Sequence, residues 1–260
     1  MKTITKFLIN LTSVGSIVLI ATLNASQLAV VGQPLPPNVG QPPTEPGGPR
    51  FVQPREDIDE RPPTQPRRPV RGGCASISQL GLTALVPKNK IGRTVSDYPT
   101  FLFYLPQTEA QSAEFILQDP SGKPIYKQDV TISNLSGVIG VSIPADKNVP
   151  PLEVGKSYTW NLTVICDSQD RSSDQIESGT VRRVEISADI RRKLDQADPR
   201  QKTVIYAENG IWQDALSTLA AARRDQPNDA ALKADWESLL DSVTLGQIAK
   251  EPIVEIEQQP

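Results

Sequence analysis

Hydrophobic and polar positions alternate in short runs through the middle of the chain, from Cys74 to about Ile186. Alternation with a period of two places successive side chains on opposite faces of a β-strand. The clearest run is Tyr158–Cys166, and in Thr100–Leu105 both faces are apolar, which predicts a central strand covered on both sides. Strands are predicted over Ile77–Val86, Thr100–Leu105, Ala113–Gln118, Ile125–Ile132, Val138–Ile143, Tyr158–Cys166 and Gln175–Ile186.

Turn-forming residues separate these runs, and no helical spacing lies between them. Asn89–Gly92 and Asp119–Gly122 are two such turns. About seven short strands joined by turns are typical of two antiparallel sheets packed face to face. The pattern therefore predicts an immunoglobulin-like antiparallel β-sandwich over residues 71–186.

After Ser187 the apolar spacing becomes helical. A first short helix has Ile190 and Leu194 on one face, and Asp198-Pro199 is typical of an N-cap followed by a first-turn proline. Gly210 ends the second helix, and a third is predicted over Trp212–Arg224. A fourth helix carries the stripe Leu232, Trp236, Leu239 and Val243. We expect a helical extension over residues 187–250 and an acidic tail over residues 251–260.

The helical extension resembles a single tetratricopeptide repeat. Small residues in such a repeat let two antiparallel helices approach closely. The matching positions are Tyr206, Gly210, Trp212, Ala215, Leu219, Ala222 and Pro227, and the departures are Pro199, Lys202 and Thr203. Because one repeat rarely stands alone, Trp212, Leu219 and Trp236 are expected to leave apolar surface for a partner, with Tyr206, Arg223 and Arg224 lining the site. The alternative is a helical appendage packed on the sandwich, without a partner.

The N-terminal segment is typical of export. Lys2 and Lys6 precede an apolar stretch and small residues, which predicts a signal peptide over residues 1–29, with an uncleaved anchor as the alternative. Residues 30–70 contain 12 of the 24 prolines and one aromatic residue, Phe51. Such a composition favours an extended, disordered linker, and the alternative is a docking peptide. We expect the mature protein to be periplasmic or secreted and to have no integral membrane part.

Cys74 and Cys166 are the only cysteines of the chain. In an exported protein two cysteines are expected to pair, and a disulfide here closes a long loop. The alternative, a reactive thiol pair, lacks the CxxC spacing and a histidine partner.

The chain contains no histidine, which removes Ser-His-Asp and Cys-His catalysis and every histidine-containing metal site. The net charge of −3 gives no basic field for nucleic acid. Asp167, Asp170 and Asp174 share one loop without the spacing of a calcium-binding loop. No cofactor, metal site or catalytic residue is predicted. Two of the acids Asp97, Glu109, Glu114 and Asp119 would suffice for a glycosidase pair, but nothing in the sequence brings any two of them together.

Several motifs resemble the cyanobacterial family called domain of unknown function 928. They are Arg71-Gly72-Gly73-Cys74, Leu82-Thr83-Ala84-Leu85-Val86-Pro87, Tyr98 to Pro106, Phe115-Ile116-Leu117-Gln118-Asp119 and Ile125-Tyr126-Lys127. The resemblance covers about residues 71 to 245. It implies an exported, non-enzymatic module without an assigned activity, so no functional residue is carried over.

Three functional hypotheses follow. The first is an exported, non-catalytic protein–protein interaction or scaffold module that binds an unknown protein partner in the envelope. The second is a carbohydrate- or envelope-binding sandwich with Tyr98, Tyr104 or Tyr126 exposed on one sheet face. The third is a hydrolase that uses carboxylates alone.

Overall fold

The structure is a computed structural model that describes residues 47–55, 74, 80–145 and 149–256. The predicted signal peptide and most of the predicted linker lie outside these residues. None of the helices in the described ranges has both the length and the apolar character needed to span a bilayer.

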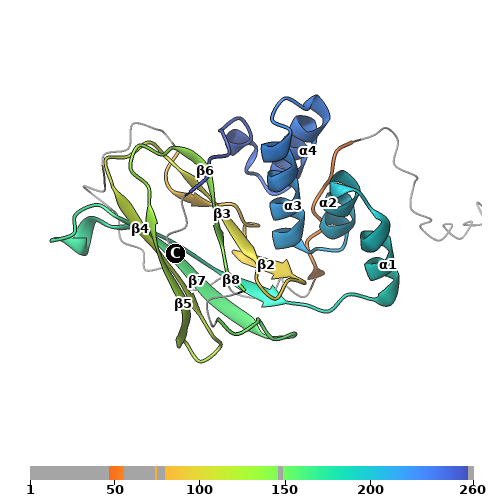
Figure 1. Cartoon of the computed structure of the whole chain (residues 1–260), viewed down its shortest axis with the longest axis horizontal. Coiled ribbons are helices and arrows are strands. Elements are labelled where there is room, and N and C mark those ends of the chain that lie inside the picture. Colours follow the sequence, from red (N-terminus) through yellow and green to blue (C-terminus); the bar gives the residue numbers. More distant parts are fainter. Residues whose placement is uncertain (1–46, 56–73, 75–79, 146–148, 257–260) are drawn as a thin grey trace, which may run out of the picture. The chain divides into compact units, whose positions relative to one another are not determined.

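Within the described residues, eight strands form two sheets (Figure 1). The three-stranded sheet has the order β1-β3-β6 and the five-stranded sheet the order β2-β8-β7-β4-β5. In chain order the strands are β1 (Thr83–Ala84), β2 (Ile91–Thr94), β3 (Thr100–Leu105), β4 (Ser112–Gln118), β5 (Pro124–Thr131), β6 (Gly137–Ser142), β7 (Ser157–Ile165) and β8 (Gln175–Arg183). Seven of them match predicted strands, with ends that differ by a few residues.

Aromatic side chains from both sheets meet in one core. The ring centroids of Phe101 in β3 and Phe115 in β4 lie 5.1 Å apart, and those of Phe103 and Trp160 lie 5.4 Å apart. In β7 the side chains alternate between buried and half-buried positions, as the sequence pattern predicts. In β3 the residues of the opposite face are buried as well, which confirms the prediction of a doubly covered strand.

The prediction of a purely antiparallel sandwich is wrong, because the five-stranded sheet is mixed. Strand β2 runs parallel to β8, and the Thr180 N–H donates to the Lys90 carbonyl at 2.8 Å. The sequence pattern places a turn at Asn89–Gly92, where β2 begins. Gly92 has a packing role: a Cβ there would lie 2.8 Å from Oε1 of Gln213, so glycine lets a helix cross β2 closely.

In the part of the chain that the structure describes, four α-helices follow the sheets: α1 (Ala188–Gln196), α2 (Pro199–Glu208), α3 (Trp212–Asp225) and α4 (Ala230–Asp241). Short 3-10 helices span Arg171–Ser173 and Gly246–Ile248. The predicted caps are confirmed: the Asp198 side chain accepts the N–H of Gln201, with Pro199 in the first turn of α2. Gly210 has φ of 71°, a conformation that glycine adopts without strain.

The expected uncovered apolar surface on the helices is not present. Trp212, Leu219 and Trp236 are each 0% exposed. Helix α3 lies against β2 and β3 (Figure 1), and Nε1 of Trp212 donates a hydrogen bond of 2.8 Å to the Leu85 carbonyl. The sheet therefore covers the side of α3 that a lone helix pair would expose, whereas Trp236 on α4 is buried beside α3 and under the Arg223 side chain.

Residues 47–55 differ from the solvated spacer that the proline-rich composition predicts. The Phe51 ring meets Trp212 edge to face, with centroids 5.1 Å apart. The Val52 N–H donates to the Ala207 carbonyl at 3.0 Å, and the Ser238 hydroxyl donates to the Pro49 carbonyl at 3.2 Å. We call residues 47–55 the N-terminal strap, because they cross α2, α3 and α4 through these contacts.

The described part of the C-terminal tail also lies on the fold. Val138 in β6 donates its N–H to the Pro252 carbonyl at 2.7 Å and accepts the Val254 N–H at 2.9 Å. The resulting bridge between Val138 and Ile253 is parallel. Residues 252–256, which we call the C-terminal segment, are thus a strand-like addition to β6 within the predicted acidic tail.

Cys74 and Cys166 form a disulfide with their Cα atoms 4.9 Å apart. The bond joins Cys74, which lies between the N-terminal strap and β1 in the sequence, to the residue that follows β7. The pairing agrees with the prediction from the sequence.

Candidate binding groove between α3 and β6

Three of the four carboxylates that the sequence offers for catalysis, Asp97, Glu114 and Asp119, are engaged in separate contacts. Asp97 pairs with Arg183, and Glu114 pairs with Lys127 on the neighbouring strand. The carboxylate of Asp119 accepts hydrogen bonds from Ser121 in its own turn, and these lower the pKa of Asp119. Among the described residues, no group of three acidic or cysteine side chains is arranged to hold a metal ion.

The acidic loop after β7 is organised by its own hydrogen bonds. Asp167 accepts the Gln169 N–H at 2.8 Å, and Asp170 accepts the Ser172 N–H at 2.9 Å. Asp174 accepts the Cys166 N–H at 3.1 Å, which fixes the loop beside the disulfide. These bonds give each carboxylate a structural role in the loop.

The tyrosines proposed as a sugar-binding surface lie mostly inside the protein. Tyr104 is 3% exposed and Tyr126 is 8% exposed. Tyr98 is half-buried, with its hydroxyl 3.4 Å from the Val149 carbonyl. The aromatic platform that the carbohydrate hypothesis requires is therefore not formed by these residues.

The three residues predicted to line a partner site are divided between different places. Tyr206 on α2 is half-buried, burial raises its pKa, and it lines a cavity near the end of β8. Arg223 lies over the Trp236 ring at 5.3 Å from its centroid, and burial lowers its pKa. Arg224 lines a second cavity, which holds the candidate site.

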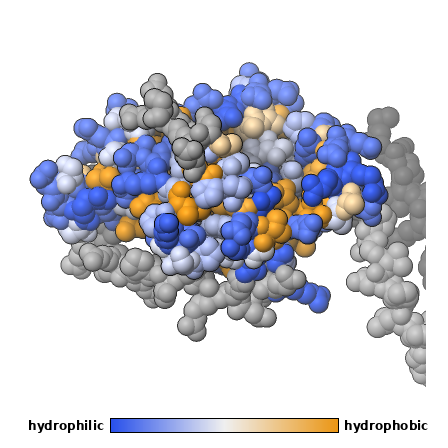
Figure 2. All heavy atoms as spheres, turned by 60° about the horizontal axis from the view of Figure 1, so that its bottom comes forward, coloured by the Kyte–Doolittle hydropathy of each residue, from blue (hydrophilic) through white to orange (hydrophobic). Residues whose placement is uncertain are grey.

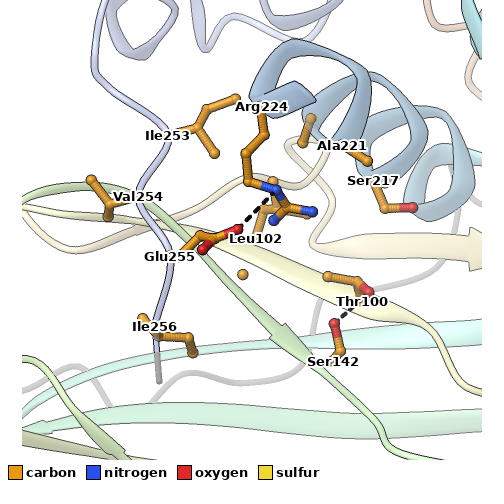
Figure 3. Close-up of a pocket in the computed structure, with 12 residues that line it drawn as sticks. Thr100, Leu102, Ser142, Ser217, Ala221, Arg224, Ile253, Val254, Glu255 and Ile256 are labelled. Atoms are coloured by element: carbon orange, nitrogen blue, oxygen red, sulfur yellow. Dashed lines mark hydrogen bonds and ion pairs between the residues drawn. The ribbon is translucent and has the colours of Figure 1, made fainter. Parts of the chain in front are cut away.

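This second cavity is a groove of about 420 Å³ between α3 and the outer face of the three-stranded sheet. Figure 3 shows Arg224 and Ser217 on the helix side and Glu255 on the C-terminal segment opposite. The groove is lined by Thr100, Leu102, Gly140, Ser142, Ser217, Ala220, Ala221, Arg224, Ile253, Val254, Glu255 and Ile256.

Small side chains on the sheet explain why the groove is hollow. Thr100 of β3 pairs with Ser142 of β6, and Leu102 pairs with Gly140. The hydroxyls of Thr100 and Ser142 are hydrogen-bonded at 2.8 Å, which gives the floor a polar end (Figure 3). A Cβ at Gly140 would lie 3.6 Å from Cγ2 of Thr100, an ordinary contact, so the space above this glycine is open.

The backbone of β6 presents hydrogen-bonding groups toward the groove. In an antiparallel pair, the backbone groups of every second residue point away from the partner strand. Val138 directs its N–H and carbonyl to the C-terminal segment, so Gly140 and Ser142, in phase with it, direct theirs to the same side. The Leu102 carbonyl accepts the Leu85 N–H on the side of β3 that faces away from β6. This is the direction expected if the paired residues Leu102 and Gly140 point their backbone groups away from each other.

One weak ion pair crosses the mouth of the groove. Nε of Arg224 lies 3.4 Å from Oε1 of Glu255, and the two side chains are 47% and 76% exposed. An ion pair with this exposure is screened by water and salt and contributes about 0 to 1 kcal/mol. The C-terminal segment therefore covers the groove without a strong charged contact.

The sequence reasoning missed Asp214, which joins α3 to the end of β2. Its carboxylate accepts the Val95 N–H at 3.2 Å and a hydrogen bond from the Thr94 hydroxyl. The residue keeps some exposed surface, yet its carboxylate lies under the end of β2, and burial raises its pKa to about 6. Its position in the first turn of α3 is the one signal in the sequence, and that position is common for a capping acid.

Hydrophobicity alone does not select a binding surface on this protein. On the face shown in Figure 2, hydrophilic residues divide the apolar surface into separate patches. The large apolar side chains that are most exposed, Val52, Val154 and Ile176, are far apart in the sequence. The groove stands out by its shape, its open strand edge and its facing charges.

Fold and groove together define a two-sheet β-protein with a C-terminal helical layer and a strand edge that can accept another segment. The model of the Domain of Unknown Function (DUF928) family matches residues 66–253, so the chain belongs to this family. No curated protein matches the chain.

Proposed function

We propose that this protein is an exported, non-catalytic module that binds another protein of the envelope, and that the groove between α3 and β6 is its binding site. The observation that carries the proposal is the hollow on the outer sheet face, where Gly140 leaves space and β6 directs backbone groups that no other described residue pairs with. Such an edge is suited to main-chain recognition of another protein.

The disulfide and the N-terminal sequence support the exported location. Disulfides persist in oxidising compartments such as the periplasm, and Cys74 and Cys166 are joined. The net charge of −3 supports a protein partner over nucleic acid.

We also infer an immunoglobulin-like sandwich and a tetratricopeptide-like pairing of α2 and α3. Aromatic residues of both sheets form a common core, which supports the first inference. Buried Ala215 and Ala222 on α3 allow close helix packing, which supports the second.

The experiment compares proteins that co-purify with tagged chains from the native envelope. The Gly140→Val variant adds a β-branched side chain that fills the groove and suits a strand. We expect it to lose at least about tenfold of the bound partner at an unchanged melting temperature, since each 1.4 kcal/mol of lost contact changes affinity tenfold.

The matched control is Thr131→Val, which adds apolar surface to the exposed edge strand β5 of the other sheet. This variant should retain the partner. If Gly140→Val binds the same proteins in the same amounts as the wild type, the groove is not the binding site.

A further inference from the structure

The groove already contains a segment that behaves as an added strand. Residues 252–256 run parallel to β6, and Val138 makes backbone hydrogen bonds to both Pro252 and Val254. Gly137 has φ of 125°, and a Cβ there would lie 2.4 Å from the Pro252 carbonyl oxygen. The start of β6 is therefore shaped for close approach of another backbone.

The strand addition is incomplete. In a regular parallel ladder the next bonds would join Gly140 to Val254 and Ile256. The hydrogen bonds between β6 and the C-terminal segment that the described residues make end at Val138, and the cavity opens beside Gly140. The edge of β6 thus has backbone groups that this segment leaves unused.

Among the described residues, few contacts retain the C-terminal segment. They are two backbone hydrogen bonds, the exposed pair between Arg224 and Glu255, and partial burial of the aliphatic side chains. A typical hydrogen bond contributes about 1 kcal/mol net, and an exposed ion pair less. A competing strand replaces it when its additional ladder bonds outweigh the high effective concentration of the attached segment.

We propose that the groove binds an extended segment of a partner protein by strand addition to β6, in place of residues 252–256. The inference rests on the proposed function and names the chemistry of the partner. The C-terminal segment indicates that chemistry: β-branched residues at the positions of Ile253 and Val254, which pack on the core, and an acidic residue at the position of Glu255, opposite Arg224. Gly140 leaves room for the incoming backbone and for side chains larger than those now present.

The test uses the full chain with a released C-terminal segment. The Val254→Pro substitution removes the N–H that donates to Val138, and Glu255→Arg opposes Arg224 without changing the backbone. A fluorescent peptide with the sequence of residues 250–258 is the probe. We expect the Val254→Pro variant to bind it at least about tenfold more tightly than the wild-type chain, because displacing the attached segment no longer opposes binding. The Glu255→Arg variant loses only an exposed ion pair, so a smaller gain of about two- to fivefold is expected.

The charge contact has its own test. A peptide with Glu255→Arg should bind the Val254→Pro chain about three- to tenfold more weakly, and Arg224→Glu in that chain should restore its binding. Circular dichroism checks that the variants are folded. Equal peptide binding by wild type and both variants, or binding that ignores the charge at position 224, overturns strand addition.

The outcomes separate this inference from the proposed function. If Gly140→Val abolishes co-purification while the peptide fails to bind either variant, the groove binds a partner of other chemistry and strand addition is wrong. If sedimentation shows that the wild-type chain forms a dimer that Val254→Pro abolishes, the occupant is a second copy, which overturns the assignment to a different protein.

Discussion

Replacing Asp214 with asparagine should change how the stability of the protein depends on pH. The carboxylate accepts hydrogen bonds from Val95 and Thr94, and burial raises its pKa from the usual 3.8 to about 6. In the folded chain the group keeps its proton up to about pH 6, whereas in the unfolded chain it releases the proton near pH 4. The free energy of unfolding therefore falls as the pH rises from about 4 to about 6. Above about pH 6 the stabilisation that the protonated carboxyl provides is lost.

The magnitude follows from the two pKa values. A difference of this size corresponds to about 3 kcal/mol, and the partial exposure of the residue makes that an upper limit. Asparagine has the same shape, stays neutral and still accepts the Val95 N–H. We expect Asp214→Asn to match the wild type near pH 4 and to exceed its stability by about 1 to 3 kcal/mol at pH 7, because the wild type alone then carries a buried charge.

Urea unfolding with the disulfide intact, at several pH values between 4 and 7, measures this difference directly. Other carboxylates titrate in the same range, but they are common to both chains and cancel in the comparison. A difference between variant and wild type that stays constant from pH 4 to 7 would show that the folded carboxyl titrates normally, and the reasoning would fail.

Two further predictions concern the ends of the fold. Phe51→Ala should lower the free energy of unfolding by about 1 to 2 kcal/mol in a denaturant titration, because a half-buried ring against Trp212 is lost. Val52→Ala, at a side chain that is 54% exposed, is its control, and an equal loss in both variants would contradict a specific anchor. Replacing both Cys74 and Cys166 with serine should cost about 4 to 5 kcal/mol in the same assay, because the disulfide restricts a long loop of the unfolded chain. A melting temperature unchanged from that of the oxidised wild type would refute this account.

The sequence predicts well those elements whose signal is local. The alternation in Tyr158–Cys166 yields β7, and the capping residues Asp198 and Gly210 place the ends of α2, because these signals depend on neighbouring residues alone. Strand β2 has only four residues, and its bonds go to β8, far along the chain. In a sequence, a glycine that is needed for close packing of a helix on a strand looks the same as a glycine in a turn.

The candidate site was predictable only in part. Arg224 was expected at a partner site and does line the groove, but the apolar helix surface expected beside it is buried by the sheet. The groove depends on Gly140 and Ser142 facing α3, which is fixed by the pairing of β6 with β3. The N-terminal strap was hidden by its proline content, although Phe51, the one aromatic residue there, was a signal for an anchor.

The N-terminal strap has a consequence for the order in which the protein matures. Phe51 hydrogen-bonds to Ser242 across 191 residues of chain, so the strap is synthesised long before the helices that it contacts exist. Contacts between such distant residues form slowly, since a long loop must close before they gain any free energy. The Ala207 carbonyl and the Trp212 ring are synthesised first, whereas the hydroxyls of Ser238 and Ser242 become available only with α4. The strap is therefore fixed in steps, and its last contacts form only after α4 has been synthesised.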